Sequence, residues 1–505
     1  MAQTQQKNQD ARKERKVPRR VAQAVISSLK GGVVPRIGLP YITVGRSSEI
    51  EALLRDVEII GDGGASFRFI VGRYGSGKSF LLQTIRNNVM DKGYVVMDAD
   101  LSPERRLQGS RGQGLATYRE LIGNLATRTK PEGGALTLVL ERWIAAVQQA
   151  VIEEEGLEPE TKAAGGPWDP EPETKAIGGT GGLAPDSKIN GKGKVPEPGK
   201  HSDNGAKPPA SQRSEFDTAV ERRIRTVARS LSEMVHGFDF AQLITLYYRG
   251  FLADDDEIRA KVVRWFRGEY MTRTEARQDL GVNAIITDDD WYDYLKLFAF
   301  FFRQAGYSGM LILIDELVNI YKIPQSVARN NNYEKILTMY NDTLQGKAQY
   351  LGILMSGTPQ CVEDTRRGIY SYEALRSRLQ EGKFSKEGAR DLLSPVIRLE
   401  PLSSEEMMVL CEKLADMHAG LYGYTRTIGT GDLVTFIRIE YGRIGADTHI
   451  TPREVIRDFI ELLDILCQHP ETDVAGLLNS DEFSYAKSEA LGGEEVSEEF
   501  ADFVL

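Results

Sequence analysis

The stretch Val71-Gly-Arg-Tyr-Gly-Ser-Gly-Lys-Ser-Phe80 decides the fold of this chain. Its residues 72–79 match the phosphate-binding P-loop (Walker A) pattern, in which a glycine is followed five positions later by Gly-Lys-Ser. Residues 66–71 form an apolar, aromatic-rich run that is typical of a short strand, and residues 80–90 carry apolar side chains at helical spacing. Strand, glycine-rich turn and helix are the context that such a loop requires. The alternative is a chance match in a glycine-rich loop.

The residue types of this loop indicate its chemistry. Glycines let the backbone approach oxygen atoms closely and adopt positive φ, and their amides, together with the helix N-terminus, attract anions. Lys78 is expected to reach the β- and γ-phosphates of a nucleotide, and Ser79 to ligate Mg²⁺. The loop residues expected to bind the nucleotide are Gly72, Arg73, Tyr74, Gly75, Ser76, Gly77, Lys78, Ser79 and Phe80.

A second motif predicts the other half of a catalytic site. The run Gly309-Met-Leu-Ile-Leu-Ile-Asp315-Glu316-Leu317 reads as an apolar strand that ends in Asp-Glu, the Walker B form. Asp315 is expected to hold Mg²⁺ through water, and Glu316 to orient and polarise the attacking water. This pattern occurs by chance in many proteins, but a P-loop on the same chain makes it informative. The pair predicts an ATPase in which Lys78 and Glu316 are catalytic.

A third strand is expected at residues 350–358, and it ends in hydroxyl side chains. In additional-strand P-loop ATPases, a strand between those of the P-loop and Walker B carries a polar tip that senses the γ-phosphate. We expect Thr358 to fill this sensor-1 role, with Ser356 as the alternative. A hydroxyl that merely caps a turn would leave the same pattern.

Three arginines follow at positions where AAA+ ATPases place nucleotide-sensing residues. Arg376 and Arg378 come after the sensor strand and are candidates for an arginine finger that acts on a neighbouring subunit's γ-phosphate. Such a finger predicts a homo-oligomer with nucleotide at the subunit interfaces. Arg453 stands in Thr451-Pro-Arg-Glu454, a capping box with proline at the first helical position, and it resembles sensor 2 of a helical lid. Ordinary surface arginines are the alternative for all three.

Two segments near the loop are read on weaker patterns. Val44, Gly45 and Arg46, with a glutamate and a helix after them, resemble the opening of AAA+ ATPases of the replication-initiator and clamp-loader kind, where this backbone borders the adenine. An ordinary helix start capped by the serines at 47–48 is the alternative. A second strand at 93–100 ends in two aspartates, which are expected to cap the following turn rather than to lie near the nucleotide.

Composition bounds the remaining possibilities. A chain of 505 residues is long enough for two or three domains. A net charge of −10 argues against a generally basic nucleic-acid binder, although a local basic patch and DNA binding stay open. No apolar run approaches the ~20 residues that span a bilayer, and no secretory signal is apparent. Three scattered cysteines indicate a reducing cytoplasm, and the five scattered histidines suggest no metal site.

Changes in composition divide the chain into six expected regions. Residues 158–213 are rich in Gly, Pro, Lys and Glu and repeat Glu158-Pro-Glu-Thr-Lys at Glu171, so they should be disordered. The expected regions are a basic disordered tail (1–20), the first part of a P-loop ATPase core (21–100), a helical insertion (101–305) that includes the disordered segment, the second part of the core (306–400), a helical lid (401–470) and an acidic tail (471–505).

Several of these stretches together resemble the ATP-binding proteins of bacterial BREX-type (bacteriophage exclusion) defence systems. The resemblance spans about residues 19–465, and its distinctive parts are Arg264-Trp-Phe-Arg-Gly-Glu-Tyr270 with the Leu280-Gly-Val that follows, and Tyr370-Ser-Tyr-Glu-Ala-Leu-Arg-Ser-Arg378. It implies an AAA+-like αβα sandwich with a parallel sheet, a large helical insertion and a C-terminal lid. It also implies other antiphage defence proteins as partners. More than two hundred positions separate Ser79 from Leu311, far more than a compact AAA+ core needs.

Two functions are consistent with these predictions. The first is a motor or loader that couples ATP hydrolysis to remodelling of DNA or a protein–DNA complex during phage defence. The second is a slow, nucleotide-gated switch or scaffold that regulates a separate effector. A third, an ATP-binding protein that barely hydrolyses, is disfavoured by Glu316. The absence of a recognisable DNA-reading motif leans toward the switch, and no nuclease, methyltransferase or protease pattern is apparent.

Overall fold

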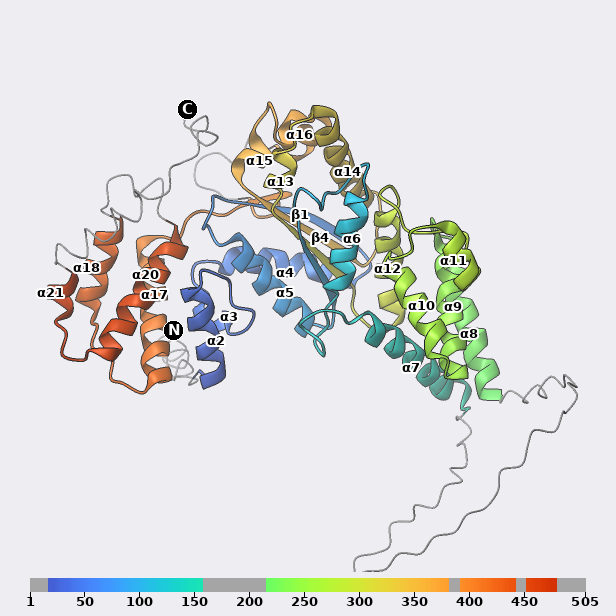
Figure 1. Cartoon of the computed structure of the whole chain (residues 1–505), viewed down its shortest axis with the longest axis horizontal. Helices are drawn as coiled ribbons and strands as arrows, with labels where there is room; N and C mark the ends of the chain where they lie inside the picture. The colour runs from blue at the N-terminus through green and yellow to red at the C-terminus, as the bar shows by residue number, and fades with distance from the viewer. Residues whose placement is uncertain (1–16, 158–214, 381–390, 442–450, 479–505) are drawn as a thin grey trace, which may run out of the picture. The chain divides into compact units, whose positions relative to one another are not determined.

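The computed structural model describes residues 17–157, 215–380, 391–441 and 451–478 (Figure 1). Most of the expected basic tail, the whole low-complexity segment 158–213 and the tail from residue 479 lie outside the described residues. The chain divides into two units, one of Met1–Ala146 with Thr226–Leu505 and one of Val147–Arg225. All strands and all predicted site residues belong to the first unit.

Five parallel strands form one sheet in the order β2-β3-β4-β1-β5. Their bounds are β1 (Ala65–Val71), β2 (Val95–Asp100), β3 (Met310–Asp315), β4 (Leu351–Gly357) and β5 (Val396–Arg398). The central strands are almost continuously apolar and buried, as expected when helices cover both faces of a parallel sheet. The predicted α/β class with a parallel sheet is therefore confirmed, and β4 lies between β1 and β3.

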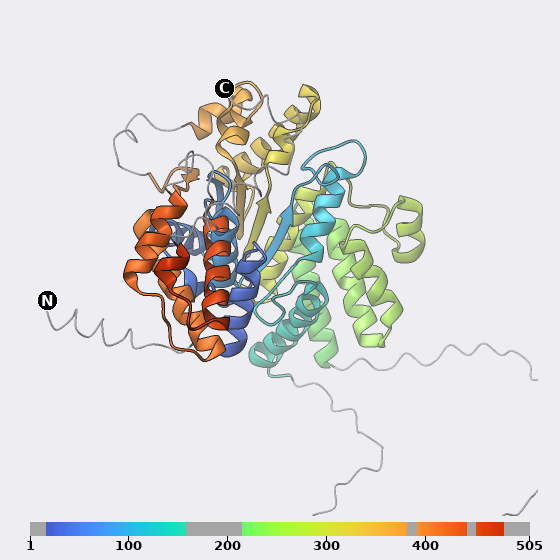
Figure 2. The ribbon, with the colours of Figure 1, turned by 60° about the vertical axis from the view of Figure 1, so that its left-hand side comes forward.

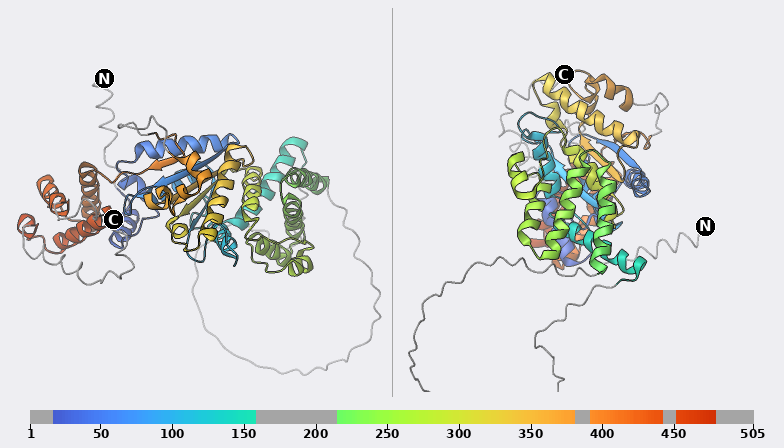
Figure 3. Two further views of the ribbon diagram at one scale, coloured as in Figure 1. Left: turned by 90° about the horizontal axis from the view of Figure 1, so that it is seen from above. Right: turned by 90° about the vertical axis from the view of Figure 1, so that its right-hand side faces the viewer.

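Helices cover the sheet on both faces. On one face, α4 (Ser47–Gly61) and α5 (Lys78–Asp91) share an apolar cluster with side chains from all the strands. On the other, α14 (Ser326–Leu344) packs on β1, and the ring of Tyr340 meets Phe67 edge-on at 5.7 Å between centroids. Figure 3 (left) shows these helices on opposite sides of the strands. Short elements follow β3 and β4, namely α13 (Val318–Tyr321), α15 (Pro359–Glu363), η1 (Ile369–Ser371) and α16 (Glu373–Leu379).

Most of the described residues between β2 and β3 form helices. The helices are α6 (Gln113–Gly123), α7 (Leu136–Glu155), α8 (Glu215–Ser232), α9 (Gly237–Ala253), α10 (Asp256–Phe266), α11 (Arg273–Leu280) and α12 (Trp291–Gln304). Aromatic rings fill their core: Phe240 lies 4.9 Å from Phe266 and 5.0 Å from Phe298. Trp265 is buried, and its indole N–H donates to the Ala284 carbonyl at 2.8 Å. Trp265, in the distinctive segment 264–270, therefore contributes to the packing of this core.

The unit Val147–Arg225 contains the second part of α7 and the first part of α8. An ion pair joins the two helices, with Arg223 Nη2 2.9 Å from Glu154 Oε1. No described helix of the chain is both long enough and apolar enough to cross a membrane.

A helical bundle combines the two ends of the described chain. It consists of α2 (Arg19–Lys30), α3 (Leu39–Ile42), α17 (Ser404–Tyr422), α18 (Thr430–Tyr441), α20 (Pro452–Gln468) and α21 (Val474–Leu478), which share one apolar cluster. Figure 2 shows α2, in blue, beside the orange and red helices. The expected capping box between Thr451 and Glu454 is present, and a second one joins Ser403 and Glu406. The residues expected to form a lid thus share their core with a segment that precedes the sheet.

A polar contact inside this bundle makes its stability depend on pH. Asp464 of α20 accepts a hydrogen bond from Lys30 of α2 at 2.6 Å, and His418 Nε2 of α17 lies 3.0 Å from its other oxygen. Burial alone would raise the pKa of Asp464, but the hydrogen bonds with Lys30 and His418 hold it below its ordinary value of 3.8. Because the folded pKa is depressed, the contact stabilises the fold above about pH 4 and is lost as pH falls through the folded pKa.

We therefore expect Asp464→Asn to lower the free energy of unfolding by about 1 kcal/mol at pH 7, a modest figure because Lys30 is largely exposed. The difference from wild type should shrink once the pH drops below 3.8. Denaturant titrations at several pH values measure this, with Asp416→Asn, which removes an exposed ion pair with Arg426, as the control. A difference that stays constant down to low pH would contradict the assignment.

Candidate nucleotide-binding site

The glycine-rich loop leaves β1 at Val71 and enters α5 at Lys78. Gly75 and Gly77 have φ of 76° and 87°, a region that non-glycine residues rarely adopt. Gly77 is the N-cap of α5, so the loop ends on the amino end of a helix of 14 residues. The free amides and the partial positive charge of that helix end favour an anion. The sequence prediction of strand, loop and helix agrees with this geometry.

Lys78 lies along its own loop. Its Nζ donates to the carbonyls of Gly72 and Arg73, each at 3.0 Å, and lies 5.4 Å from the centre of the Tyr74 ring. Burial lowers the pKa of Lys78 below its ordinary value, and the nearby carboxylates of Asp315 and Glu316 oppose that shift. Lys78 is therefore close enough to the carboxylates at the end of β3 to interact with them electrostatically.

Asp315 connects the loop with β3 and β4. Ser79 Oγ donates to Asp315 Oδ2 at 2.9 Å, the Glu316 amide donates to Oδ1 at 2.8 Å, and Ser356 Oγ also donates to Oδ1. The fold thus brings together the hydroxyl and the carboxylate that were predicted to hold Mg²⁺. Their donor set suits that ion, which prefers oxygen ligands and is usually bound through one or two carboxylates together with phosphate oxygens.

Glu316 has a strained backbone. Its φ is 60°, in the left-handed region, which is uncommon for a side chain of this kind and is enriched at functional sites. The strain is held in place by hydrogen bonds on either side, from Leu317 N to Ser356 O at 3.1 Å and from Asn319 N to Glu316 O at 3.0 Å. Burial, reinforced by the charge of Asp315, raises the pKa of Glu316, while Lys78 lowers it.

The two hydroxyls at the end of β4 have different surroundings. Ser356 is fully buried and binds Asp315, as given above. Thr358 is 7% exposed, and in the described part of the chain its Oγ1 has no hydrogen-bond partner. Thr358 occupies the N-cap of α15 without a side-chain cap bond, so the turn-capping alternative is wrong for this residue. The choice between Thr358 and Ser356 as a phosphate sensor stays a prediction.

A pocket faces the loop, and both polar and apolar side chains line it. The polar ones include Lys78, Ser79, Glu316 and Arg453. The apolar ones include Leu29, Val33, Ile42, Val44, Leu402 and Ile456. Such a mixture suits a ligand that has both a flat apolar ring system and charged oxygens. Except for Val44, these apolar residues were not predicted, because apolar positions in helices look like ordinary core in a sequence.

A family comparison adds an independent observation. The family model described as BREX system ATP-binding protein BrxC/D matches residues 17–167 and 200–482. The chain belongs to this family. A search of curated proteins found no match. Membership supports ATP as the ligand and makes the chain a component of phage defence, together with other defence proteins. It confirms the family resemblance expected from the sequence.

Some of the remaining predicted residues of this BREX ATP-binding protein line the pocket, and others do not. Val44, Arg46, Arg453 and the loop residues from Tyr74 to Phe80 line the pocket. The residues Gly45, Gly72, Arg73, Asp315 and Thr358 are not part of that lining. Arg46, rather than Ser47 or Ser48, occupies the N-cap of α4, so the alternative of a serine-capped helix is wrong.

Arg376 and Arg378 lie on α16, outside the pocket lining. Arg376 pairs with Glu373 at 2.6 Å, and Arg378 donates to the Ala374 carbonyl at 2.6 Å, both at exposed positions. Neither acts on the pocket of its own chain in this arrangement. An action on a neighbouring subunit stays a prediction.

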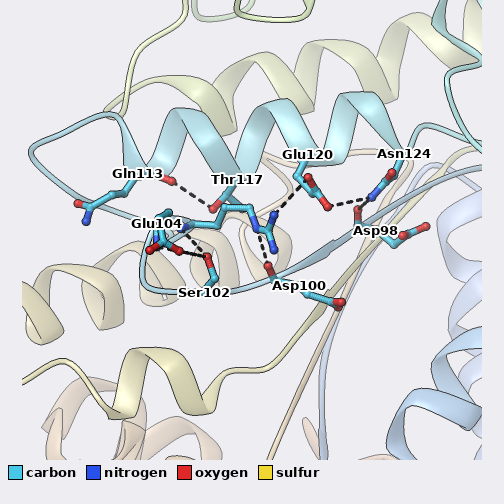
Figure 4. Close-up of polar contacts among 9 residues, drawn as sticks. Asp98, Asp100, Ser102, Glu104, Gln113, Thr117, Glu120 and Asn124 are labelled. Carbon is cyan, nitrogen blue, oxygen red and sulfur yellow. Dashed lines mark hydrogen bonds and ion pairs between the residues drawn. The ribbon is translucent and has the colours of Figure 1, made fainter. Parts of the chain in front are cut away.

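The sequence predicted that the aspartates at the end of β2 cap the following turn, but they do not (Figure 4). That turn is capped by Ser102, whose Oγ accepts from the amides of Glu104 and Arg105 at 3.2 and 3.1 Å. Asp98 binds Arg86 at 3.0 Å, and Asp100 stands in register with Asp315 on the neighbouring strand. Partial desolvation and the charge of Asp315 raise the pKa of Asp100. The carboxyl end of the sheet therefore gathers more negative charge than the sequence motifs indicated.

The tip of the loop touches the helical bundle, which gives a steric prediction. A methyl group added at Gly75 would lie 2.5 Å from Thr451 Cβ, whereas one added at Gly77 would meet nothing within 4 Å. Both Gly75→Ala and Gly77→Ala place alanine in the left-handed region, at about 1–2 kcal/mol. Gly75→Ala should lose about 1–3 kcal/mol more, because Thr451 must move. Denaturant unfolding without nucleotide compares them, and equal losses would show that the loop and the bundle do not press together.

Proposed function

We propose that this BREX family member is an AAA+-like P-loop ATPase that hydrolyses ATP with Mg²⁺ and couples hydrolysis to remodelling of DNA or of a protein–DNA complex. The observation that carries the proposal is the linked group of Ser79, Asp315 and Glu316 opposite Lys78, at the carboxyl end of a parallel sheet. ATP-binding proteins that only bind nucleotide have no need of a strained, half-buried glutamate beside the metal-binding carboxylate.

Each residue has a defined role in this proposal. The loop amides and Lys78 bind the phosphates, with Lys78 moving from the Gly72 and Arg73 carbonyls to the β- and γ-oxygens. Ser79 and Asp315 hold Mg²⁺, which supplies charge neutralisation at the phosphates when bound. Glu316 orients the attacking water and accepts its proton. Phosphoryl transfer depends mainly on positioning and charge stabilisation, so an added arginine from a neighbour would raise the rate.

Several features support the coupling of the site to movement. Residues that follow β1 and β3, residues of the segment before the sheet and residues of the bundle all line the same pocket. A ligand that contacts these elements together favours the arrangement that closes them around it. Arg453 at the start of α20 would sense the phosphates from the bundle side. Arg376 and Arg378 would do so from a neighbouring subunit of a homo-oligomer.

A slow nucleotide-gated switch that regulates a separate effector is the second candidate. The net charge of −10 favours it, because a DNA motor needs a basic path for the phosphate backbone. The two functions differ in what stimulates turnover.

Steady-state ATP hydrolysis by the purified full chain tests the proposal, with Mg²⁺ or with a chelator, and with or without duplex DNA. We expect turnover that requires Mg²⁺ and rises several-fold with DNA. Turnover that is indifferent to DNA but rises with a partner defence protein would replace the remodelling proposal with the switch. Nucleotide binding without turnover under all these conditions, including with partner proteins, would overturn the hydrolase proposal.

A further inference from the structure

The segment 43–46, just before α4, contacts α17, the phosphate-binding loop and the connection between β5 and α17. Lys413 of α17 donates to the Thr43 carbonyl at 2.8 Å. A carbon added at Gly45 would lie 2.1 Å from Glu406 Oε1, so a larger residue would displace the carboxylate of the capping box that begins α17. Gly45 also has a φ of 68°. The backbone of this segment is therefore seated on the first helix that follows the sheet.

Arg46 extends these contacts to the loop. Its side chain is 5% exposed, and Nη2 donates to the Ser76 carbonyl at 2.9 Å and to the Glu400 carbonyl at 2.6 Å. Nη1 lies 3.4 Å from Glu49 Oε1. A buried guanidinium is stable only when its charge and donors are satisfied, and here two backbone carbonyls and a carboxylate satisfy them.

The two carbonyls belong to parts of the chain that have different tasks. Ser76 is in the loop that is expected to hold the phosphates. Glu400 is in the short connection 399–403, which runs from β5 to α17 and joins the sheet to the bundle. One side-chain nitrogen thus holds the loop and this connection together. A shift of the bundle that moves Glu400 must either carry the Ser76 carbonyl along or break one of the two bonds.

We propose that Arg46 is a positioning residue that couples the helical bundle to the phosphate-binding loop. This inference rests on nucleotide binding at the loop, part of the proposed function, and does not require hydrolysis. The connection to the bundle is linked to the loop through Arg46, and Thr451 of the bundle contacts the loop at Gly75, so closure of the bundle sets the loop in its phosphate-binding form. Arginine suits this position because Nη2 donates to both carbonyls while Nη1 faces the Glu49 carboxylate, and the single nitrogen of lysine cannot serve all three acceptors.

The test compares Arg46→Ala and Arg46→Lys with wild type and with Arg55→Ala. Arg55 lies on α4, whose N-cap is Arg46, and forms an exposed ion pair with Glu51 at 2.8 Å, so its variant controls for the loss of a positive charge near α4. Two quantities are measured on the full chain: the equilibrium affinity for Mg²⁺–ATP, and amide hydrogen exchange in segments 72–80 and 399–403 with and without saturating Mg²⁺–ATP.

In wild type and Arg55→Ala, ATP is expected to slow exchange in both segments. In Arg46→Ala the affinity should fall by about tenfold or more, since two charge-assisted hydrogen bonds are lost. At saturating ATP, segment 72–80 should still be protected while 399–403 is not. Arg46→Lys should show the same loss of protection in segment 399–403, and it serves as the test if Arg46→Ala does not fold.

Protection of 399–403 by ATP in both Arg46 variants, equal to that in wild type, would overturn the proposal. A general loss of packing would instead raise exchange in both segments without nucleotide, which the same data reveal. The readouts are ATP binding and amide hydrogen exchange, neither of which needs turnover. If the wild-type chain binds ATP without turnover, the hydrolysis proposal fails, and the exchange data still test the role of Arg46.

Discussion

Replacing Glu316 with glutamine is expected to lower kcat for ATP hydrolysis by about a hundredfold to ten-thousandfold, the usual contribution of a general base. Glutamine keeps the size and the hydrogen-bonding reach of the side chain but cannot accept a proton. The contacts that hold this position are made by backbone groups, from Leu317 N to Ser356 O and from Asn319 N to Glu316 O, and they survive the change. The affinity for ATP should therefore stay near the wild-type value while turnover disappears.

The measurement is steady-state ATP hydrolysis beside equilibrium ATP binding. Glu334→Gln is the matched control, because Glu334 is an exposed glutamate of α14 that is not part of the pocket lining. Turnover by Glu316→Gln at the wild-type rate would remove Glu316 from the mechanism. An equal loss of binding and turnover would mean that the side chain supports the loop rather than the chemistry.

Asp56→Ala is expected to cause the largest loss of stability, about 3–5 kcal/mol, the usual result of leaving a buried charge without its partner. Arg68 of β1 and Asp56 of α4 form two hydrogen bonds, at 2.6 and 2.7 Å, with side chains only 10% and 8% exposed. Arg68 Nη1 also donates to the carbonyls of Leu393 and Ser394, each at 2.6 Å, so it holds the chain that leads into β5.

Thermal and denaturant unfolding measure this loss. The double variant Asp56→Leu with Arg68→Leu should recover much of it, because two apolar residues leave no buried charge. Glu51→Ala, which breaks the exposed pair with Arg55, serves as the control and should change stability by less than about 1 kcal/mol. Similar stabilities for Asp56→Ala and Glu51→Ala would show that Arg68 finds water or another partner.

The parts of the site that depend on local pattern could be predicted from the sequence. The loop at 72–79, the Asp-Glu end of β3 and the capping box from Thr451 to Glu454 each occupy a few consecutive residues with a characteristic spacing. In these stretches, local chemistry and tertiary structure favour the same conformation.

Features that depend on distant contacts could not be predicted. Arg46 receives its partners from positions 30 and 354 residues away along the chain. The positive φ of Glu316 has no signal in the residue type, since glutamate rarely adopts it. The two aspartates of β2 were expected to cap a turn because this is a common local use of aspartate. Instead, Asp98 pairs with Arg86 and Asp100 lies in register with Asp315, and both of these neighbours are on other elements.

The composition of the bundle also has a consequence for synthesis. The apolar face of α2, formed by Ala22, Val25 and Ile26, packs against helices that begin only at Ser404, more than three hundred residues later. At a translation rate of about 5–20 residues per second, this face is synthesised about 20–75 s before the helices that cover it. During that time a chaperone or a neighbouring nascent chain competes for it. The apolar wall of the nucleotide pocket is consequently the last part of the site to form, whereas the loop and β3 meet earlier.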